Sequence, residues 1–382
     1  MPFDFTQHSP EVTIKDRHCG YGKSTDLIAS LSSERSYLIV LPLNSEVQRF
    51  INDAPVALVE PITVESGGIH RRKRDHLREL LNGGHSIVTT HALFTDVAFL
   101  AMEGLLLGYD VVVDEVLSVV RCVTQELLTD GAKANGVAIK SWKGLYLDHG
   151  FATVDQETGM VRATEEWDRK QDLPELSKAL FNMAKADCLF SVGDNVLLWE
   201  LPPVLLMAVG SLTVYTFLAE GSLMASFMRR NGIVFDLDRD PASERRFRDQ
   251  ARSLIDVRGM PSINKLRFSY SAQNAMTKAD HSRVSAALKR LRERDLKGTD
   301  RNNVMITSAK SMWFGRNGKP GPFSSQSRLF QDTNWLPNTT RGTNDYRHCS
   351  HLIYLYDQNI NPSIAQFLGG SCREVGGNLK VA

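Results

Sequence analysis

The chain lacks the cysteine pattern of a disulfide-rich or zinc-binding protein and has no long hydrophobic run. Its five cysteines are scattered over 382 residues, odd in number and without a Cys-x-x-Cys pair. This usage favours reduced thiols, so we expect a cytoplasmic protein. The most apolar stretch, residues 196–209, is interrupted by Glu200 and Pro202 and is too short to span a bilayer. We therefore expect no membrane partner.

A net charge of either sign is also almost absent. The formal charge at pH 7 is +1, which neither requires nor excludes a nucleic-acid partner, because basic patches can lie within a neutral total. The hydrophobic share of 42% and the charged share of 23% are ordinary for a globular protein. The length allows two domains with substantial cores.

A glycine-rich loop near the start of the chain is the strongest motif. Gly20 and Gly22 permit a turn whose N–H groups surround phosphate oxygens; Lys23 adds a positive charge for the β- and γ-phosphates. A helically spaced run follows, so the loop opens onto a helix N-terminus. The full phosphate-loop pattern has a glycine where this chain has Arg17, and a turn with a surface lysine is the simpler alternative. The predicted nucleotide-binding residues are Gly20, Tyr21, Gly22, Lys23, Ser24 and Thr25, and Ser24 is also a predicted Mg²⁺ ligand.

Two carboxylates follow a strongly apolar stretch. Residues 111–113 are consecutive valines, typical of a central strand, and Asp114 and Glu115 come directly after them. Open α/β sheets bind ligands at the carboxyl ends of their strands. We predict that Asp114 holds Mg²⁺ and that Glu115 polarises the attacking water. An acidic strand end is common by itself, but together with the phosphate loop it predicts a nucleoside-triphosphate site.

Apolar runs of strand length alternate with helical patterns along the chain. The run at residues 36–42 does not alternate with polar residues, which suits a strand buried on both faces of a parallel sheet. We predict an α/β fold with mostly parallel central sheets. The first domain is expected over residues 1–230, with an insertion of helices and loops at about 117–205, and the second over residues 231–382.

Basic segments and hydroxyl-rich strand ends are weaker signals. Residues 69–76 and 283–297 each fit either a solvated helix face or a contact with nucleic-acid phosphates. Residues 89–91, Thr-Thr-His, end a short apolar run and suit contact with a phosphate, although a capped turn is equally natural. The loop at residues 341–344, Arg-Gly-Thr-Asn, precedes an apolar run typical of a buried strand. This composition suits the nucleotide-facing edge of a second α/β domain, although by itself it is only a turn-rich loop.

The order of these motifs resembles superfamily 2 helicases, in particular the divergent DEAD/DEAH-like type encoded by bacteriophages and mobile elements. The resemblance implies two RecA-like domains with ATP and Mg²⁺ at their interface and a DNA or RNA strand, DNA being favoured, across both. A phage-encoded protein would work in the host cytoplasm. The corresponding segments are 20–24, 41–42, 89–91, 114–115, 213–222, 307–308 and 341–344, matching motifs I, Ia, Ic, II, III, IV and V.

The resemblance also assigns roles to individual residues. It implies catalytic roles for Lys23, Asp114, Glu115 and Arg373, and nucleotide contacts by Gly342 and Asn344. The nucleic-acid contacts that it implies are Thr89, Thr90, His91, Thr307 and Arg341.

Motif VI departs from the family. Gln366, Gly369 and Arg373 match it, but Gly370 stands where the family has its first arginine. An arginine finger is worth about 10³–10⁵ in related phosphoryl-transfer sites. Arg373 is the candidate finger, so we expect slowed hydrolysis or an arginine from a partner protein. Ala382 follows only nine residues later, and a truncated second domain is a further expectation.

The predicted function is that of an ATP-dependent nucleic-acid helicase or translocase. One alternative is a degenerate ATP-binding module that binds nucleic acid or protein without efficient hydrolysis. Another is a phage DNA-packaging ATPase, which would need a nuclease domain with clustered carboxylates. No obvious cluster of that kind follows residue 230.

Overall fold

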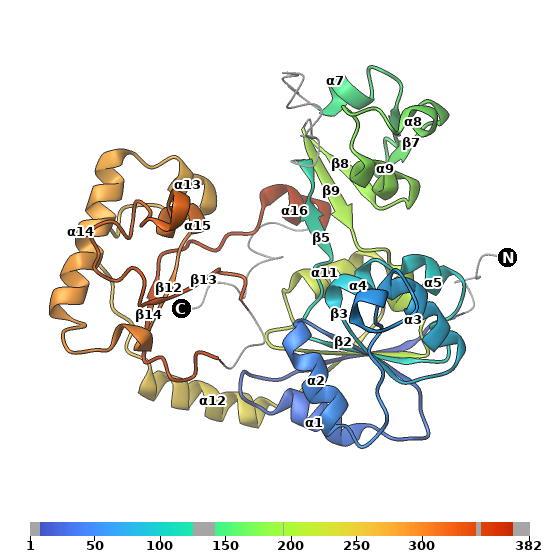
Figure 1. Ribbon diagram of the computed structural model, residues 1–382, viewed down its shortest axis with the longest axis horizontal. Coiled ribbons are helices and arrows are strands. Elements are labelled where there is room, and N and C mark those ends of the chain that lie inside the picture. Colours follow the sequence, from blue (N-terminus) through green and yellow to red (C-terminus); the bar gives the residue numbers. More distant parts are fainter. Residues whose placement is uncertain (1–7, 125–141, 194, 341–344, 370–382) are drawn as a thin grey trace. The chain divides into compact units, whose positions relative to one another are not determined.

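The computed structural model describes residues 8–124, 142–193, 195–340 and 345–369 (Figure 1). The chain forms two compact units. The first comprises Met1–Glu244 and Ile360–Val381, and the second comprises Arg245–Asn359. The chain therefore leaves the first unit and returns to it near its end.

A parallel sheet of six strands is the framework of the first unit, in the order β11-β1-β10-β4-β2-β3. Every neighbouring pair is parallel, so all six carboxyl ends lie at one edge. The predicted α/β class with a parallel central sheet is confirmed. The strands are β1 (Glu11–Asp16), β2 (Tyr37–Leu41), β3 (Ile87–Thr90), β4 (Asp110–Asp114), β10 (Ser211–Thr216) and β11 (Asp236–Arg239).

Both faces of this sheet are covered by helices, as the apolar run in β2 predicts. Leu38 and Val40 pack into one core, which includes residues of α3, α4, α5 and α11. Ile39 and Leu41 point to the opposite face and pack with residues of α1 and α2. The helices of this unit's main body are α1 (Lys23–Ser30), α2 (Asn44–Asp53), η2 (Val64–Ser66), α3 (Lys73–Asn82), α4 (His91–Thr95), α5 (Ala98–Met102), α10 (Val204–Met207) and α11 (Leu223–Arg230).

The boundary between the units differs from the one expected at residue 230. The sequence predicts that residues 233–237 open the second domain, whereas β11 pairs with β1 at the edge of the first unit's sheet. The physical reason is a pair of contacts that are distant in sequence. Leu237 packs against the first unit's core, and Arg17 forms an ion pair with Asp238 at 2.7 Å. The division falls at Glu244, inside α12 (Pro241–Leu254).

The inserted segment contains small antiparallel sheets as well as the expected helices and loops. Its described part is closed around an aromatic core in which the rings of Tyr146 and Trp167 lie 4.7 Å apart. The strands pair in the order β5-β9-β8, with β6-β7 as a separate hairpin. The elements are β5 (Val120–Cys122), α7 (Trp142–Tyr146), β6 (Ala152–Val154), β7 (Val161–Ala163), α8 (Glu165–Lys170), α9 (Lys178–Lys185), β8 (Leu189–Val192) and β9 (Val196–Glu200).

The second unit has its own parallel sheet, of three strands in the order β13-β12-β14. Val284 and Leu288, which belong to the basic segment at residues 283–297, are buried in the core that covers this sheet. The elements are α13 (Tyr270–Asn274), α14 (Lys278–Arg294), η4 (Arg301–Asn303), β12 (Val304–Thr307), α15 (Lys310–Trp313), η5 (Arg316–Gly318), β13 (Asn334–Leu336) and β14 (His351–Tyr354).

Helix α16 (Pro362–Phe367) belongs to the first unit. Asn361 caps it by accepting a hydrogen bond from the backbone N–H of Ser363, and the proline at its start suits a first helical position. The Phe367 ring lies 5.0 Å from that of Phe190, and the Arg230 guanidinium lies 4.0 Å from the centre of the Phe367 ring. Among the residues described, no helix has the length and apolar character needed to cross a membrane.

Candidate nucleotide site

The loop between β1 and α1 has a backbone that glycine favours. Gly20 and Gly22 have φ angles of 76° and 100°, in the left-handed region where other residues are strained. Gly22 occupies the capping position of α1, so the helix begins at Lys23. The two glycines therefore allow the sharp turn that leads into the helix.

Two contacts bring this loop against the end of β4. The Lys23 ammonium lies 2.9 Å from a carboxylate oxygen of Glu115, and the Ser24 hydroxyl donates to Asp114 at 3.2 Å. The partners are about ninety residues apart in sequence, and they meet because β1 and β4 are parallel neighbours of β10. The structure thus places together the four residues that the sequence singles out for phosphate, metal and water.

Asp114 is the most buried member of this group, with 8% of its surface exposed. Burial, and next the charge of Glu115, raise the pKa of the Asp114 carboxyl above its ordinary value, while Lys23 and the hydrogen bond from Ser24 oppose the rise. A buried carboxylate beside a second one attracts a cation. The Ser24 hydroxyl and the Asp114 carboxylate are the hard oxygen ligands that Mg²⁺ prefers, so this donor set fits the metal.

Glu115 has a strained backbone. Its φ of 63° lies in the left-handed region, and its N–H donates to the carbonyl oxygen of Tyr215 at 2.8 Å. A non-glycine residue in this region costs about 1–3 kcal/mol, and such residues cluster at functional sites. The turn sets Glu115 next to Lys23 directly after the strand ends.

Residues of β11 and of the segment just after it hold the phosphate loop from the side. Arg17 donates to the Asp238 carboxylate at 2.7 Å, and the Tyr21 hydroxyl donates to Asp240 at 3.3 Å. A ring nitrogen of His18 lies 3.1 Å from the Ser243 hydroxyl. Arg17, which replaces the first glycine of the full motif, therefore anchors the loop to the sheet's edge strand. Sequence reasoning missed these partners; their only local signal is the Asp-rich stretch at residues 236–240.

Asp16 links the phosphate-loop strand to the loop after β10. Its carboxylate accepts hydrogen bonds from the backbone N–H groups of Leu218 and Ala219, at 2.8 and 3.1 Å. Leu218 is strained, with a φ of 58°. Arg239 lies 3.4 Å from Asp16 and 2.9 Å from Glu220. Asp16 was not among the predicted site residues, although it ends the strand before the loop.

The predicted nucleic-acid residues at the end of β3 differ in exposure. Thr89 is buried, with 3% of its surface exposed, so its hydroxyl does not face solvent. Thr90 is half-buried and precedes α4. His91 begins that helix, and a nitrogen of its ring lies 2.8 Å from the backbone oxygen of Asp114. His91 therefore connects β3 to the carboxylate strand.

In the second unit, Thr307 does not present its hydroxyl to solvent. The residue is 4% exposed, and its hydroxyl donates to the carbonyl oxygen of Leu336 at 2.9 Å, across the sheet. In the free protein this hydroxyl is therefore used within the sheet, and the nucleic-acid contact by Thr307 stays a prediction. The remaining predicted residues lie outside the described part of the chain: Arg341, Gly342, Asn344 and Arg373.

Comparisons with known proteins give distant likenesses. A family model described as the YonV C-terminal Rossmann-like domain matches residues 249–379. The SPbeta prophage-derived uncharacterized protein YonV of Bacillus subtilis (strain 168) is 22% identical over 382 positions, covering 93% of this chain and 86% of that protein. A solved structure named XPD_APO aligns over 94% of this chain and 84% of that chain, with a TM-score of 0.47 and 13% identity. The Rossmann-like description agrees with the parallel sheet of the second unit.

Proposed function

We propose that the protein is an Mg²⁺-dependent ATPase of two RecA-like domains that acts on nucleic acid as a helicase or translocase. One observation carries the proposal: Lys23 and Ser24 of a glycine-bounded loop meet Glu115 and Asp114 at the carboxyl edge of a parallel sheet. The chemistry of that set matches what transfer of a phosphoryl group to water requires.

Each residue has a distinct role in this proposal. The backbone N–H groups of the loop and Lys23 bind the β- and γ-phosphates, and Ser24 and Asp114 hold the metal, which neutralises phosphate charge. Glu115 orients the attacking water and accepts its proton. In the free protein Lys23 pairs with Glu115. A phosphate that binds Lys23 would replace Glu115 as its partner, and the Glu115 carboxylate would then be free to bind the attacking water.

The nucleic-acid part of the proposal rests on the order of the motifs. Thr90 and His91 lie at the same sheet edge as the nucleotide residues, where a bound strand would be sensed through the hydrogen bond from His91 to Asp114. Arg341, Gly342 and Asn344 are proposed to complete the site from the second domain, and Arg373 is the proposed arginine finger. DNA is the favoured strand.

A second candidate is a nucleotide-binding module that does not hydrolyse efficiently. The observation that favours it is Gly370, which stands where the related helicases have the first of two arginines. A partner protein that supplies an arginine would restore hydrolysis. The two candidates share the phosphate loop and differ only in turnover.

Steady-state ATP turnover of the full chain, measured alone and with single-stranded DNA, double-stranded DNA or RNA, separates these candidates. We expect turnover that rises with at least one of the strands. Nucleotide binding without turnover under any of these conditions would favour the second candidate. Absence of nucleotide binding in the presence of Mg²⁺ would contradict both.

A further inference from the structure

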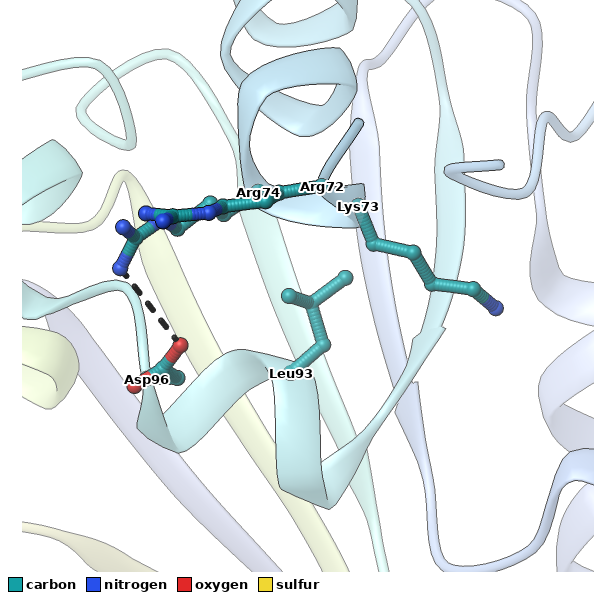
Figure 2. A pocket seen from close by; sticks show the side chains of 5 residues that line it. All are labelled: Arg72, Lys73, Arg74, Leu93 and Asp96. Atoms are coloured by element: carbon teal, nitrogen blue, oxygen red, sulfur yellow. Dashed lines mark ion pairs between the residues drawn. The ribbon is translucent and has the colours of Figure 1, made fainter. Parts of the chain in front are cut away.

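A positively charged pocket lies between the start of α3 and helix α4, away from the phosphate loop. It has a volume of about 390 Å³ and is lined by Arg72, Lys73, Arg74, Leu93 and Asp96 (Figure 2). Pockets of roughly 300–1,000 Å³ are typical of ligand sites. Three of its five lining residues carry a positive charge and only one carries a negative charge.

The two arginines are the cations that face a ligand. Figure 2 shows Arg72 and Arg74 extending in the same direction, toward the side where Asp96 lies, whereas Lys73 points away from them. Lys73 has its own partner, because its ammonium lies 2.7 Å from a carboxylate oxygen of Glu60. The paired lysine therefore contributes little free charge to the side occupied by the arginines.

The pairing of these arginines is incomplete. A guanidinium nitrogen of Arg74 lies 4.0 Å from the Asp96 carboxylate, the limit of an ion pair, and the guanidinium lies 6.0 Å from the centre of the Phe99 ring. Arg72 is exposed, and in the described ranges it forms no ion pair. By contrast, the neighbouring Arg78 makes two hydrogen bonds to Glu103, at 2.6 and 2.9 Å. The pocket thus keeps positive charge available where the rest of the helix neutralises it.

The position of these charges disfavours a purely structural role. Arg72 is the capping residue of α3, and its side chain makes no capping hydrogen bond. Positive charges at this end of a helix oppose its dipole, and Asp75 is the only acidic residue in the first turn. An anion in the pocket would relieve this repulsion. Binding of an anion at this helix end would offset the unfavourable interaction of the arginines with the helix dipole.

The pocket is also connected to the nucleotide site. Leu93 lies in α4, and Asp96 is the residue that caps the end of this helix. The helix begins with His91, whose ring contacts the backbone oxygen of Asp114. An anion that shifts α4 would therefore also shift His91 and, through its contact, the end of β4, where Asp114 and Glu115 lie.

We propose that this pocket binds a phosphate group of a nucleic-acid strand through Arg72 and Arg74, with Leu93 against the adjoining sugar. This inference rests on the proposed function and deepens its nucleic-acid part, because it adds a contact that the motifs do not include. A single phosphate offers oxygens to both guanidinium groups, and arginine binds phosphate with two parallel hydrogen bonds.

Binding of fluorescent single-stranded DNA and RNA to the full chain, followed by anisotropy over a range of salt concentrations without nucleotide, tests the inference. We expect the double variant Arg72→Ala, Arg74→Ala to bind at least tenfold more weakly, with a salt slope smaller by about 1. The variant Arg72→Lys, Arg74→Lys retains charge and should recover part of the affinity. The matched control is Arg162→Ala, Arg169→Ala, which removes two exposed arginines of the insertion.

A gain of affinity provides a test that misfolding cannot imitate. Asp96 competes with the strand for Arg74, and its side chain is 69% exposed, so Asp96→Asn should tighten binding by roughly twofold to fivefold, the size of an exposed ion pair. Inorganic phosphate, added as a competitor at constant ionic strength, should displace the strand only weakly.

Three results would overturn the inference. The first is a double variant that binds like the control, the second is an Asp96→Asn protein that binds no more tightly, and the third is strong displacement by inorganic phosphate, which marks a small-anion site. Failure of the ATPase proposal gives a different result. In that case the protein shows no ATP turnover but still binds nucleic acid through Arg72 and Arg74.

Discussion

The carboxyl edges of the two sheets are both formed by parallel strands, but the groups at the ends of their central strands differ in chemistry. In the first unit, Lys23, Asp114 and Glu115 bring three formal charges to the edge, and each charge faces another. In the second unit, the hydrogen-bonded groups at the end of β12 are neutral. Thr307 donates to Leu336, and the backbone N–H of Ala309 donates to the side chain of Gln273 at 3.0 Å.

The Gln273 side chain bonds to backbone groups within the second unit, so at this sheet edge its hydrogen bonds stabilise the fold. It is fully buried, and its amide nitrogen donates to the carbonyl oxygens of Phe268 at 2.6 Å and Leu355 at 3.1 Å. The comparison shows that the carboxyl edge of a parallel sheet is not sufficient for a ligand-binding site. Such a site also needs charged side chains whose present partners a ligand can replace. In the described part of the chain, only the first edge combines such charges with a glycine-bounded loop.

Replacing Lys23 should have the largest effect on ligand binding. Lys23→Ala removes the charge that faces the phosphates, and we expect nucleotide binding to be lost, with Kd raised at least about 100-fold, or about 2.7 kcal/mol. Titration with a fluorescent ATP analogue measures the change. Lys185→Ala, which removes a half-exposed lysine of the insertion, is the control. Equal affinity in the two variants would mean that the first edge is not the nucleotide site.

Replacing Gln273 should affect stability rather than binding. Gln273→Ala leaves two buried backbone groups without these partners, the N–H of Ala309 and the carbonyl oxygen of Leu355, whereas the carbonyl oxygen of Phe268 still accepts from the N–H of Asp357. Each unsatisfied group costs about 1–3 kcal/mol, so we expect a loss of about 2 kcal/mol or more in unfolding free energy. Denaturant unfolding monitors it, with the exposed Gln250→Ala as control. A wild-type midpoint for Gln273→Ala would show that this network is not structural.

Replacing Asp114 should have the smallest effect on stability, and with the opposite sign. Burial raises the pKa of this carboxyl in the folded chain, so its ionised form destabilises the metal-free protein at neutral pH. Asp114→Asn should therefore unfold at a higher temperature than the wild type at pH 7. The difference should vanish as the pH falls through the raised pKa toward the ordinary value, because the wild-type carboxyl then also becomes neutral.

A surface carboxylate provides the contrasting case. Hydrogen bonds from the backbone and side chain of Thr158 lower the pKa of Asp155. Asp155→Asn should therefore lower the unfolding temperature at neutral pH, and the loss should disappear in acid below the lowered pKa. Thermal scans of both variants between neutral and acid pH check the signs. A lower unfolding temperature for Asp114→Asn than for the wild type at pH 7 would contradict the burial argument for Asp114.

The sequence was sufficient for the parts of the fold that depend on local pattern. The unalternated run around Ile39 predicts a strand buried on both faces, and the valines before Asp114 predict a central strand with carboxylates at its end; both strands are present. Parallel strands bring the segments that follow them to one edge, as predicted for the phosphate loop and for Asp114 and Glu115, whereas the contact of Lys23 with Glu115 depends on the strand order β1-β10-β4. These inferences needed no knowledge of side-chain direction.

What the sequence could not supply depends on long-range contacts. Strand β11 is polar, Asp-Leu-Asp-Arg, and only its pairing with β1 and the ion pair from Arg17 place it in the first unit. The sequence of a short apolar strand also does not determine whether the Thr307 side chain points into the unit or toward solvent. The pocket at Arg72 and Arg74 required the packing of α4 to distinguish it from an ordinary basic helix face.

Turnover by Glu115→Gln tests the central claim most directly. The amide keeps the shape of the side chain but cannot accept a proton, and general-base catalysis contributes about 10²–10⁴-fold. We therefore expect ATP turnover to fall by that factor while the affinity for ATP and Mg²⁺ stays within a few-fold of the wild type. Unchanged hydrolysis in the purified variant would contradict the assignment of Glu115 and, with it, the proposed ATPase mechanism.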